Sequence, residues 1–368
     1  MKPAPLGPLA AFTGKWIGSG FNTIFRPSSK KSPAGPFPVP PTGPDSVLEL
    51  NLTSETMSFA PNLGSIPNRG FDTQEDIFLN GVPYLQSIND VTTLPARRIH
   101  FEPGIWLSVP ATTTPEECAT LARMAVIPHG TTINAQGTFE SKTGKPLIAA
   151  VDITPFQAET GLRAPRGAFP SLIATNQDTY RLPQDLAPFT AAGTITQAML
   201  TDPNTVLRDQ IANQNISETV VIDISTTPTA PLFGGGLANI AFLLGVYPPP
   251  ASGRGPNAQA VLMKATFWIE TVLYQIKVPP MRTGDAPLVL SPVQTNPRVP
   301  LVPRFLVSIP FVEGKKFAGG TISMSATQIQ YSQETILNFS GISWPHVSVA
   351  SLIPADPIPV PTPLLPLT

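Results

Sequence analysis

The stretch Gly14-Lys15-Trp16-Ile17-Gly18-Ser19-Gly20 decides the expected fold. It opens a segment of aromatic and β-branched residues that runs to Phe25, which indicates a strand. Glycines at alternate positions leave one face without side chains, so the strand can bend or lie close to another backbone. Trp16 is large enough to close one end of a barrel. The stretch therefore predicts a curved barrel strand that ends on an indole.

Similar segments lie on both sides of a middle region at residues 165–200. They are rich in β-branched and aromatic residues and are bounded by turn residues. They comprise Val47–Leu52, Ile77–Val82, Ile99–Val109, Leu121–Ile127, Glu218–Ser225, Ala260–Val278, Phe305–Ile309, Thr321–Tyr331 and Thr335–Leu352. Capped helix starts are few, at Thr114-Pro115-Glu116-Glu117 and at Asp202-Pro203-Asn204. We expect an all-β protein with few short helices.

The position of the middle region predicts two antiparallel β-barrels in tandem. We place the first barrel at residues 1–165, a linker or excursion at 166–200, and the second barrel at 201–352. The Pro-rich tail at 353–368 should be extended. A length of 368 residues suits two domains of about 150 residues or more.

Composition excludes several classes of function. Lys and Arg number 23 against 24 for Asp and Glu, so there is no basic excess to hold nucleic acid. A single cysteine, Cys118, excludes an intramolecular disulfide, and three histidines leave little material for a metal site, so no metal is predicted. No secretory signal and no 18-residue apolar stretch is found, so we expect a soluble, cytoplasmic protein without a transmembrane segment.

Several motifs resemble the strands of nitrobindin-type β-barrels, the heme-binding relatives of the lipocalin and fatty-acid-binding calycins. The stretch at residues 14–20 resembles the first strand of that family. Tyr84-x-Gln86 and His100-x-Glu102-x-Gly104-x-Trp106 follow in the order of the family, and Pro128-His129-Gly130 stands where the family carries Pro-Thr-Gly. The resemblance covers residues 10–140 and implies a calycin-like barrel, so the tandem barrels are expected to be calycin-like.

The resemblance does not imply heme binding in the first barrel. The family holds the iron through a histidine near the C-terminal end of the barrel, and residues 137–217 contain no histidine. His346 is the candidate for an equivalent ligand in the second barrel. Heme therefore remains a possible cofactor only with His346 as the iron ligand.

A short sequence pattern, which we call the echo, recurs in the two halves of the chain. Tyr84-Leu85-Gln86 is followed by Gly104-Ile105-Trp106, and Tyr331-Ser332-Gln333 is followed by Gly341-Ile342-Ser343-Trp344. The spacing differs between the halves, so the echo is either a weak repeat or a chance similarity.

Candidate catalytic residues are His100, Glu102 and His129. Residues i and i+2 of a strand share a face, so the His100 imidazole and the Glu102 carboxylate point the same way. A carboxylate beside a histidine fixes its tautomer and suits general acid–base chemistry. The alternative is a hydrogen-bonded pair that only orders the barrel. His129 follows a proline in a turn, where it is either functional or simply exposed.

Candidate ligand contacts come from large or polar side chains expected inside the barrels or at their ends. They are Trp16, Tyr84, Gln86, Trp106, Arg26, His346 and Tyr331. Structural roles are the alternative: the tryptophans plug a barrel, Arg26 caps an end by cation–π contact, and His346 belongs to the core.

Three functions follow from this interpretation. The leading one is binding of a small hydrophobic molecule inside a barrel. The second is an enzyme of the two-barrel calycin type, an isomerase, cyclase or hydratase, that acts on an apolar substrate through His100 and Glu102; this is a fold-level analogy. The third is a heme protein that uses His346. The sequence leaves the ligand and the oligomeric state open.

Overall fold

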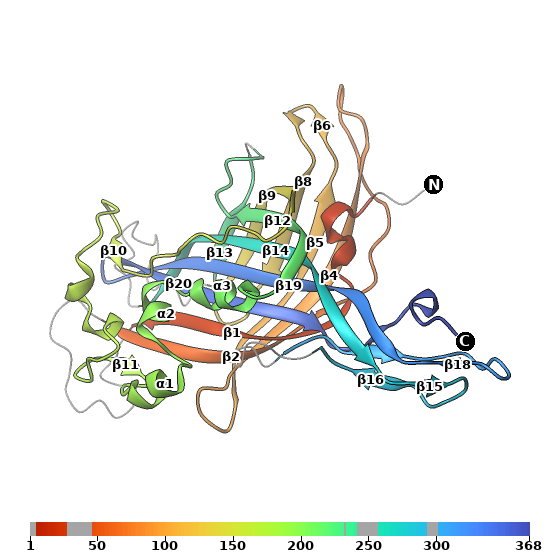
Figure 1. Cartoon of the computed structure of the whole chain (residues 1–368). Coiled ribbons are helices and arrows are strands. Elements are labelled where there is room, and N and C mark those ends of the chain that lie inside the picture. The colour runs from red at the N-terminus through yellow and green to blue at the C-terminus, as the bar shows by residue number, and fades with distance from the viewer. Residues whose placement is uncertain (1–4, 28–45, 232, 241–256, 293–300) are drawn as a thin grey trace.

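Antiparallel strands form one closed β-barrel at the centre of the molecule (Figure 1). The computed structural model describes residues 5–27, 46–231, 233–240, 257–292 and 301–368. Within these residues, ten strands make the barrel: β1 (Gly14–Arg26), β2 (Val47–Phe59), β4 (Ile77–Asp90), β5 (Arg97–Val109), β8 (Thr120–Val126), β9 (Thr131–Thr143), β12 (Asn215–Ser225), β14 (Gln259–Val278), β19 (Gly320–Phe339) and β20 (Ile342–Pro354). Pairing of β2 with β4 closes the barrel. The all-β class is confirmed.

The tandem arrangement is not confirmed, because strands from both halves of the chain share this barrel. β1 pairs with β20, where Trp16 lies opposite Pro354, and β9 pairs with β12, where Gly137 lies opposite Ile224. Residues 1–165 and 201–352 therefore supply neighbouring strands of the same wall. Hydrophobic alternation identified the strands, but it carries no information about which distant strand each one pairs with.

The glycines of β1 allow close packing of β20, as the sequence indicated. A Cβ added to Gly18 would lie 2.6 Å from the backbone oxygen of Ser351. Trp16 is 3% exposed, and its indole N–H donates to the Thr13 backbone oxygen at 2.8 Å. The short helix η1 (Gly7–Ala11) packs at the same end. Trp16 therefore helps to close one end of the barrel.

Residues 144–214, between β9 and β12, cover part of the outer wall. This cover contains β10 (Phe156–Gln157), η2 (Arg166–Ala168), η3 (Pro170–Leu172), β11 (Arg181–Leu182), α1 (Ala187–Ala192), α2 (Gln197–Thr201) and α3 (Thr205–Ile211). Outward side chains such as Phe21, Trp268 and Trp344 are buried beneath it. The predicted excursion at 166–200 thus belongs to a longer cover, and the predicted helix after Asn204 is confirmed as α3.

The predicted helix start at Thr114 is wrong. Residues around it form a two-stranded turn of β6 (Thr112–Thr113) and β7 (Glu116–Glu117). Two further short strands, β3 (Ile66–Asn68) and β13 (Gly236–Asn239), pair with β4 and β9. Among the described residues, no helix has the length and apolar character needed to span a membrane.

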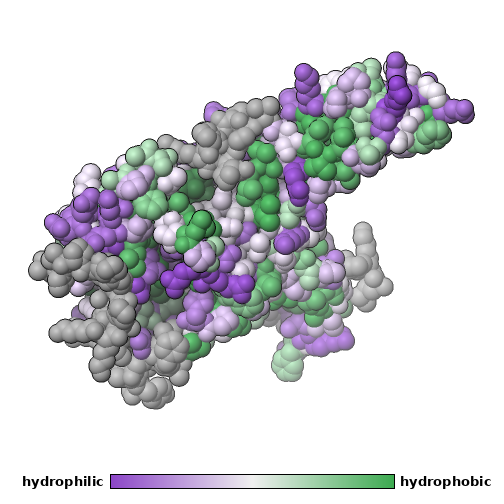
Figure 2. Space-filling view, turned by 90° about the horizontal axis from the view of Figure 1, so that it is seen from below, coloured by the Kyte–Doolittle hydropathy of each residue, from purple (hydrophilic) through white to green (hydrophobic). Residues whose placement is uncertain are grey.

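An arm extends from the barrel at the lower right of Figure 1. It continues the long β14 and β19 and adds β15 (Met281–Arg282), β16 (Leu288–Leu290), β17 (Phe305–Val307), β18 (Lys316–Phe317), β21 (Ile358–Pro359) and η4 (Thr362–Leu364). Phe305, Phe317 and Ile322 belong to its own apolar core. In Figure 2 hydrophobic and hydrophilic residues lie side by side on the arm. The Pro-rich tail is largely extended, and its β21 pairs with β17 of the arm.

Candidate functional site

A cavity of about 350 Å³ lies inside the barrel, toward the end opposite Trp16. Because side chains alternate along each strand, inward residues of β1, β2, β4, β5, β19 and β20 reach it together. All three histidines of the chain line it, together with Gln86 and Tyr331. Residues far apart in the sequence, such as Asn22 and His346, thus meet in one place.

The cavity combines apolar walls with polar groups. Ile24, Ile88, Ile99, Ile127 and Leu337 are among its apolar lining residues. Asn22, Asn51, Gln86 and Tyr331 contribute amide and hydroxyl groups. Ligand sites typically have mainly apolar walls and a few convergent polar groups, in a volume of roughly 300–1,000 Å³.

His346 is held in its neutral form. The Asn22 side-chain amide donates to its Nε2 at 2.8 Å and to the Ser348 hydroxyl at 2.6 Å, and Asn51 donates to the Asn22 oxygen at 3.1 Å. Burial, together with the charges of the other two histidines, lowers the pKa of His346 to about 3. Nε2 of His346 therefore accepts a hydrogen bond, and its ring proton belongs on Nδ1.

The other two histidines lie edge to face. The His100 and His129 ring centroids are 5.4 Å apart, with an interplanar angle of 89°. His100 donates through Nε2 to the Glu102 carboxylate at 3.0 Å. Burial and the nearby His100 lower the pKa of His129. The His100 and Glu102 pair expected from strand alternation is therefore formed at the edge of the cavity.

Glu102 is the centre of a buried ionic cluster. Its side chain is fully buried, and it accepts hydrogen bonds from Arg123, Tyr84 and His100. Arg123 also donates to the Tyr84 oxygen at 2.8 Å and to Gln333 at 2.7 Å. Burial alone would raise the pKa of Glu102, but Arg123 and the hydrogen bonds outweigh it and lower the pKa to about 2. Glu102 therefore stays ionised and is paired with a cation.

The pKa of a second buried carboxyl group, that of Glu55, is shifted in the opposite direction. Glu55 accepts from Tyr331 at 2.6 Å, from Thr53 at 2.9 Å and from Gln86 at 3.3 Å. Gln86 also donates to the Tyr331 oxygen at 3.1 Å. Burial raises the pKa of Glu55 despite these hydrogen bonds, and no arginine contacts it among the described interactions. The interior thus holds one carboxylate paired with a cation and one carboxyl biased toward its protonated form.

The predicted site residues fall into three groups by depth. The cavity is lined by His100, His129, Gln86, Tyr331 and His346, whereas Tyr84 and Glu102 belong to the ionic cluster beside it. Trp16 and Trp106 lie in the packed interior and do not line the cavity. Arg26 forms an ion pair at 2.7 Å with Glu49, a cavity-lining residue.

Sequence reasoning missed several polar residues of the interior, among them Asn22, Asn51, Glu55, Arg123 and Gln333. A signal for them existed. Each lies an even number of positions from an inward apolar residue of its own strand, as Glu55 does from Met57 and Arg123 from Leu121. A polar residue on the buried face of a strand needs a partner, which marks it as part of a network.

The histidines do not fit heme as they are arranged. His346 is neutral and lies at the cavity wall on the last barrel strand, which suits an iron ligand, but its Nε2 lone pair is taken by Asn22. The Nε2 of His100 is likewise directed at Glu102. Within the described residues, no group of three or more His, Cys, Asp or Glu side chains has the geometry to hold a metal ion.

Comparisons with known proteins add little to this geometry. No family model and no curated protein matches the sequence. The crystal structure of Rv2717c from M. tuberculosis is similar at 10% sequence identity, with coverage of 96% of this chain and 99% of that chain and a TM-score of 0.35.

Proposed function

We propose that the barrel binds a small, uncharged, amphipathic molecule in the cavity beside the histidines. The observation that carries the proposal is an internal space of about 350 Å³ with isoleucine walls and a cluster of polar groups. An apolar body would contact the walls, and a hydroxyl or carbonyl would reach Tyr331, Gln86 or Asn51. The order of the nitrobindin-type motifs along β1, β4 and β5 is consistent with a nitrobindin-like, calycin-type barrel, and we include this membership in the proposal.

The charge balance favours an uncharged ligand. Glu102 is paired with Arg123, burial raises the pKa of Glu55, and the lowered pKa of His346 keeps that ring neutral at pH 7. An anionic ligand would have to be desolvated beside these groups without gaining a free cation from them. The charge balance therefore favours a hydrophobic ligand whose polar end carries no charge.

Mass spectrometry of the freshly purified, denatured protein identifies a retained ligand directly. Binding itself is measured by fluorescence titration with Prodan, a neutral amphipathic naphthalene dye. Leu337→Trp places a larger side chain in the cavity wall and should weaken Prodan binding at least tenfold. Met124→Trp on the exposed outer wall is the matched control and should leave binding unchanged.

Two results would contradict the proposal. Equal Prodan affinity in Leu337→Trp and in the original protein would place the dye elsewhere. A Soret absorption band in the protein as purified, lost in His346→Ala, would show that Asn22 releases His346 to iron and that heme is the ligand.

A second candidate function is acid–base catalysis on the bound molecule. The observation that favours it is the 3.0 Å contact of His100 with an ionised Glu102 at the cavity edge. Glu102 fixes the proton on Nε2, so Nδ1 can take a proton from one position of the ligand and return it to another, as an isomerase requires. A cyclase or hydratase would use the same pair.

The discriminating variant is His100→Gln. If the protein is an isomerase of this kind, the ligand identified by mass spectrometry is converted by the original protein, and His100→Gln retains Prodan binding but loses conversion. If the ligand is recovered unchanged after prolonged incubation with the original protein, the barrel binds without catalysis.

A further inference from the structure

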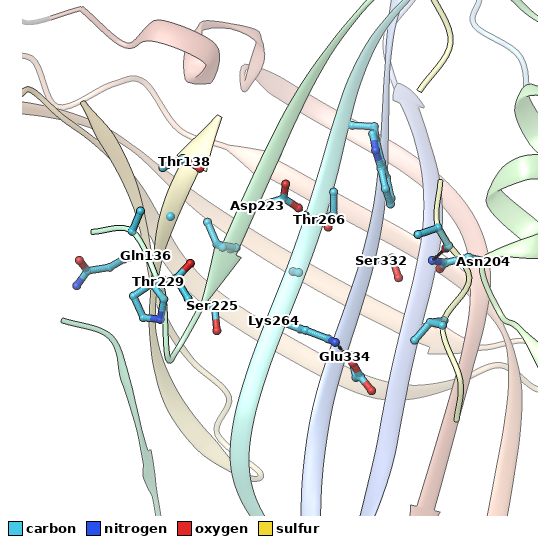
Figure 3. Close-up of a pocket in the computed structure, with 18 of the residues that line it drawn as sticks. Gln136, Thr138, Asn204, Asp223, Ser225, Thr229, Lys264, Thr266, Ser332 and Glu334 are labelled. Atoms are coloured by element: carbon cyan, nitrogen blue, oxygen red, sulfur yellow. Dashed lines mark hydrogen bonds and ion pairs between the residues drawn. The ribbon is translucent and has the colours of Figure 1, made fainter. Parts of the chain in front are cut away.

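A second hollow lies on the outside of the barrel. Figure 3 shows its floor, formed by outward side chains of β9, β12, β14 and β19. Residues 149–151 of the cover and residues 228–230 also line it. Its volume is about 390 Å³. The groove is thus bounded by the barrel wall and by two separate segments of chain.

The floor of the groove carries paired polar groups. Thr266 donates to the Asp223 carboxylate at 2.6 Å, which connects β14 to β12. Lys264 forms an ion pair with Glu334 at 2.7 Å, which connects β14 to β19, and the Glu334 side chain is only 7% exposed. Trp268, on the same face of β14, adds an apolar surface. A site of this kind offers acceptors, one cation and an aromatic ring within a single hollow.

An unpartnered buried atom marks one end of the groove. Asn204 is 5% exposed, and its side-chain nitrogen donates to the Ala149 backbone oxygen at 2.7 Å. Its Oδ1 atom is buried and has no hydrogen-bond partner in the structure. A buried acceptor left without a donor costs about 1–3 kcal/mol, so it indicates a donor that the chain itself does not supply.

We propose that this groove binds a neutral polyhydroxy compound of monosaccharide or disaccharide size. Hydroxyl groups both donate and accept, so a single ligand can donate to Asp223, Glu334 and Asn204 Oδ1 and accept from Lys264. An anion would meet two carboxylates against one ammonium group, and an apolar ligand would leave Asn204 Oδ1 without a donor. Trp268 is 5% exposed, so it contributes only a small apolar patch to the groove wall.

The test uses the full chain and a panel of D-glucose, D-galactose, D-mannose, maltose and cellobiose. Saturation-transfer difference NMR detects binding, and calorimetry measures the affinity of the best member. Ala150→Trp puts an indole into the groove from the cover segment and should lower that affinity at least tenfold. Leu147→Trp is the matched control, because Leu147 is 93% exposed on the same segment and does not line the groove.

Each outcome decides the proposal. Binding of a panel member that Ala150→Trp abolishes and Leu147→Trp preserves supports it. It is overturned if no member of the panel binds, or if Ala150→Trp leaves the affinity unchanged. It is also overturned if putrescine binds in place of the sugars and Asp223→Asn lowers the affinity for putrescine tenfold, since the groove would then be a cation site.

Discussion

Replacing Arg123 by methionine should destabilise the barrel strongly at neutral pH. Arg123 is 1% exposed and Glu102 is fully buried, so the substitution leaves a carboxylate in the interior without its cation. Removing one partner of a buried ion pair typically costs about 3–5 kcal/mol. Methionine keeps most of the aliphatic volume, so the loss reports mainly on charge rather than on a cavity.

The pKa of Glu102 gives a second way to calculate how much the Arg123 contact stabilises the fold. It is lowered from 4.5 to about 2, which corresponds to roughly 3 kcal/mol at about 1.4 kcal/mol for each pKa unit. In the original protein this contribution is complete above pH 4.5 and is lost as the pH falls toward 2. Without Arg123, burial becomes the dominant influence and the pKa of Glu102 rises above that of the unfolded chain. The variant should then gain stability as the pH falls from 7 to 5.

Urea unfolding followed by tryptophan fluorescence at pH 7 and pH 5 measures this effect. We expect the difference in unfolding free energy between Arg123→Met and the original protein to be about 3–5 kcal/mol at pH 7 and clearly smaller at pH 5. The double variant Arg123→Met with Glu102→Gln removes the uncompensated charge and should recover part of the loss. A difference below about 1 kcal/mol, or one equal at both pH values, would refute the assignment of Glu102 as an ionised partner of Arg123.

Three further predictions use the same urea assay. Tyr331→Phe removes the hydroxyl that donates to Glu55 and accepts from Gln86, and should cost about 1–3 kcal/mol; an unchanged midpoint would show that the Glu55 cluster is open to water. Glu270 is buried on the outer wall and burial raises its pKa to about 8, so its folded form retains a proton that the unfolded chain loses above pH 4.5. Stability therefore falls between pH 4.5 and 8, and Glu270→Gln should stabilise the protein by roughly 1–3 kcal/mol at pH 8 and not at pH 4; equal effects at both pH values would contradict this. Gly18→Val should cost at least about 1–3 kcal/mol because its Cβ would meet β20, whereas Ser19→Val is the control and should be tolerated; equal losses would contradict the close approach.

The sequence predicted local features of the fold better than its global pairing. The segment containing Trp16 and the pair His100 and Glu102 depend only on alternation along one strand, and both occur as predicted. The closure of one barrel depends on β1 meeting β20, more than 300 positions away. Hydrophobic periodicity is the same whether a strand pairs with a near or a distant neighbour, so two barrels and one barrel give similar patterns.

The echo between the halves has a different meaning in the single barrel. Tyr84 and Gln86 face the interior from β4, and Tyr331 and Gln333 face it from β19. Each tyrosine donates to a different buried glutamate, Tyr84 to Glu102 and Tyr331 to Glu55, and Gln86 also reaches Tyr331. Gln333 accepts from Arg123, so on both strands the tyrosine and the glutamine two positions away share the inward face and join the buried polar network. The similarity is therefore explained by a shared interior role, with no duplicated barrel required.

The contrast between Glu55 and Glu102 decides what the interior can accept. Both carboxyls are buried and each contacts a tyrosine, yet only Glu102 contacts Arg123, and the pKa values move in opposite directions. Burial raises the pKa of Glu55, whereas the Arg123 guanidinium lowers the pKa of Glu102. Both carboxyls are connected to the cavity lining, Glu55 through Tyr331 and Gln86, and Glu102 through His100. Because Arg123 is already paired with Glu102 and no arginine contacts Glu55 among the described interactions, this network offers no free arginine to an anion, which favours a ligand with a neutral hydroxyl or carbonyl.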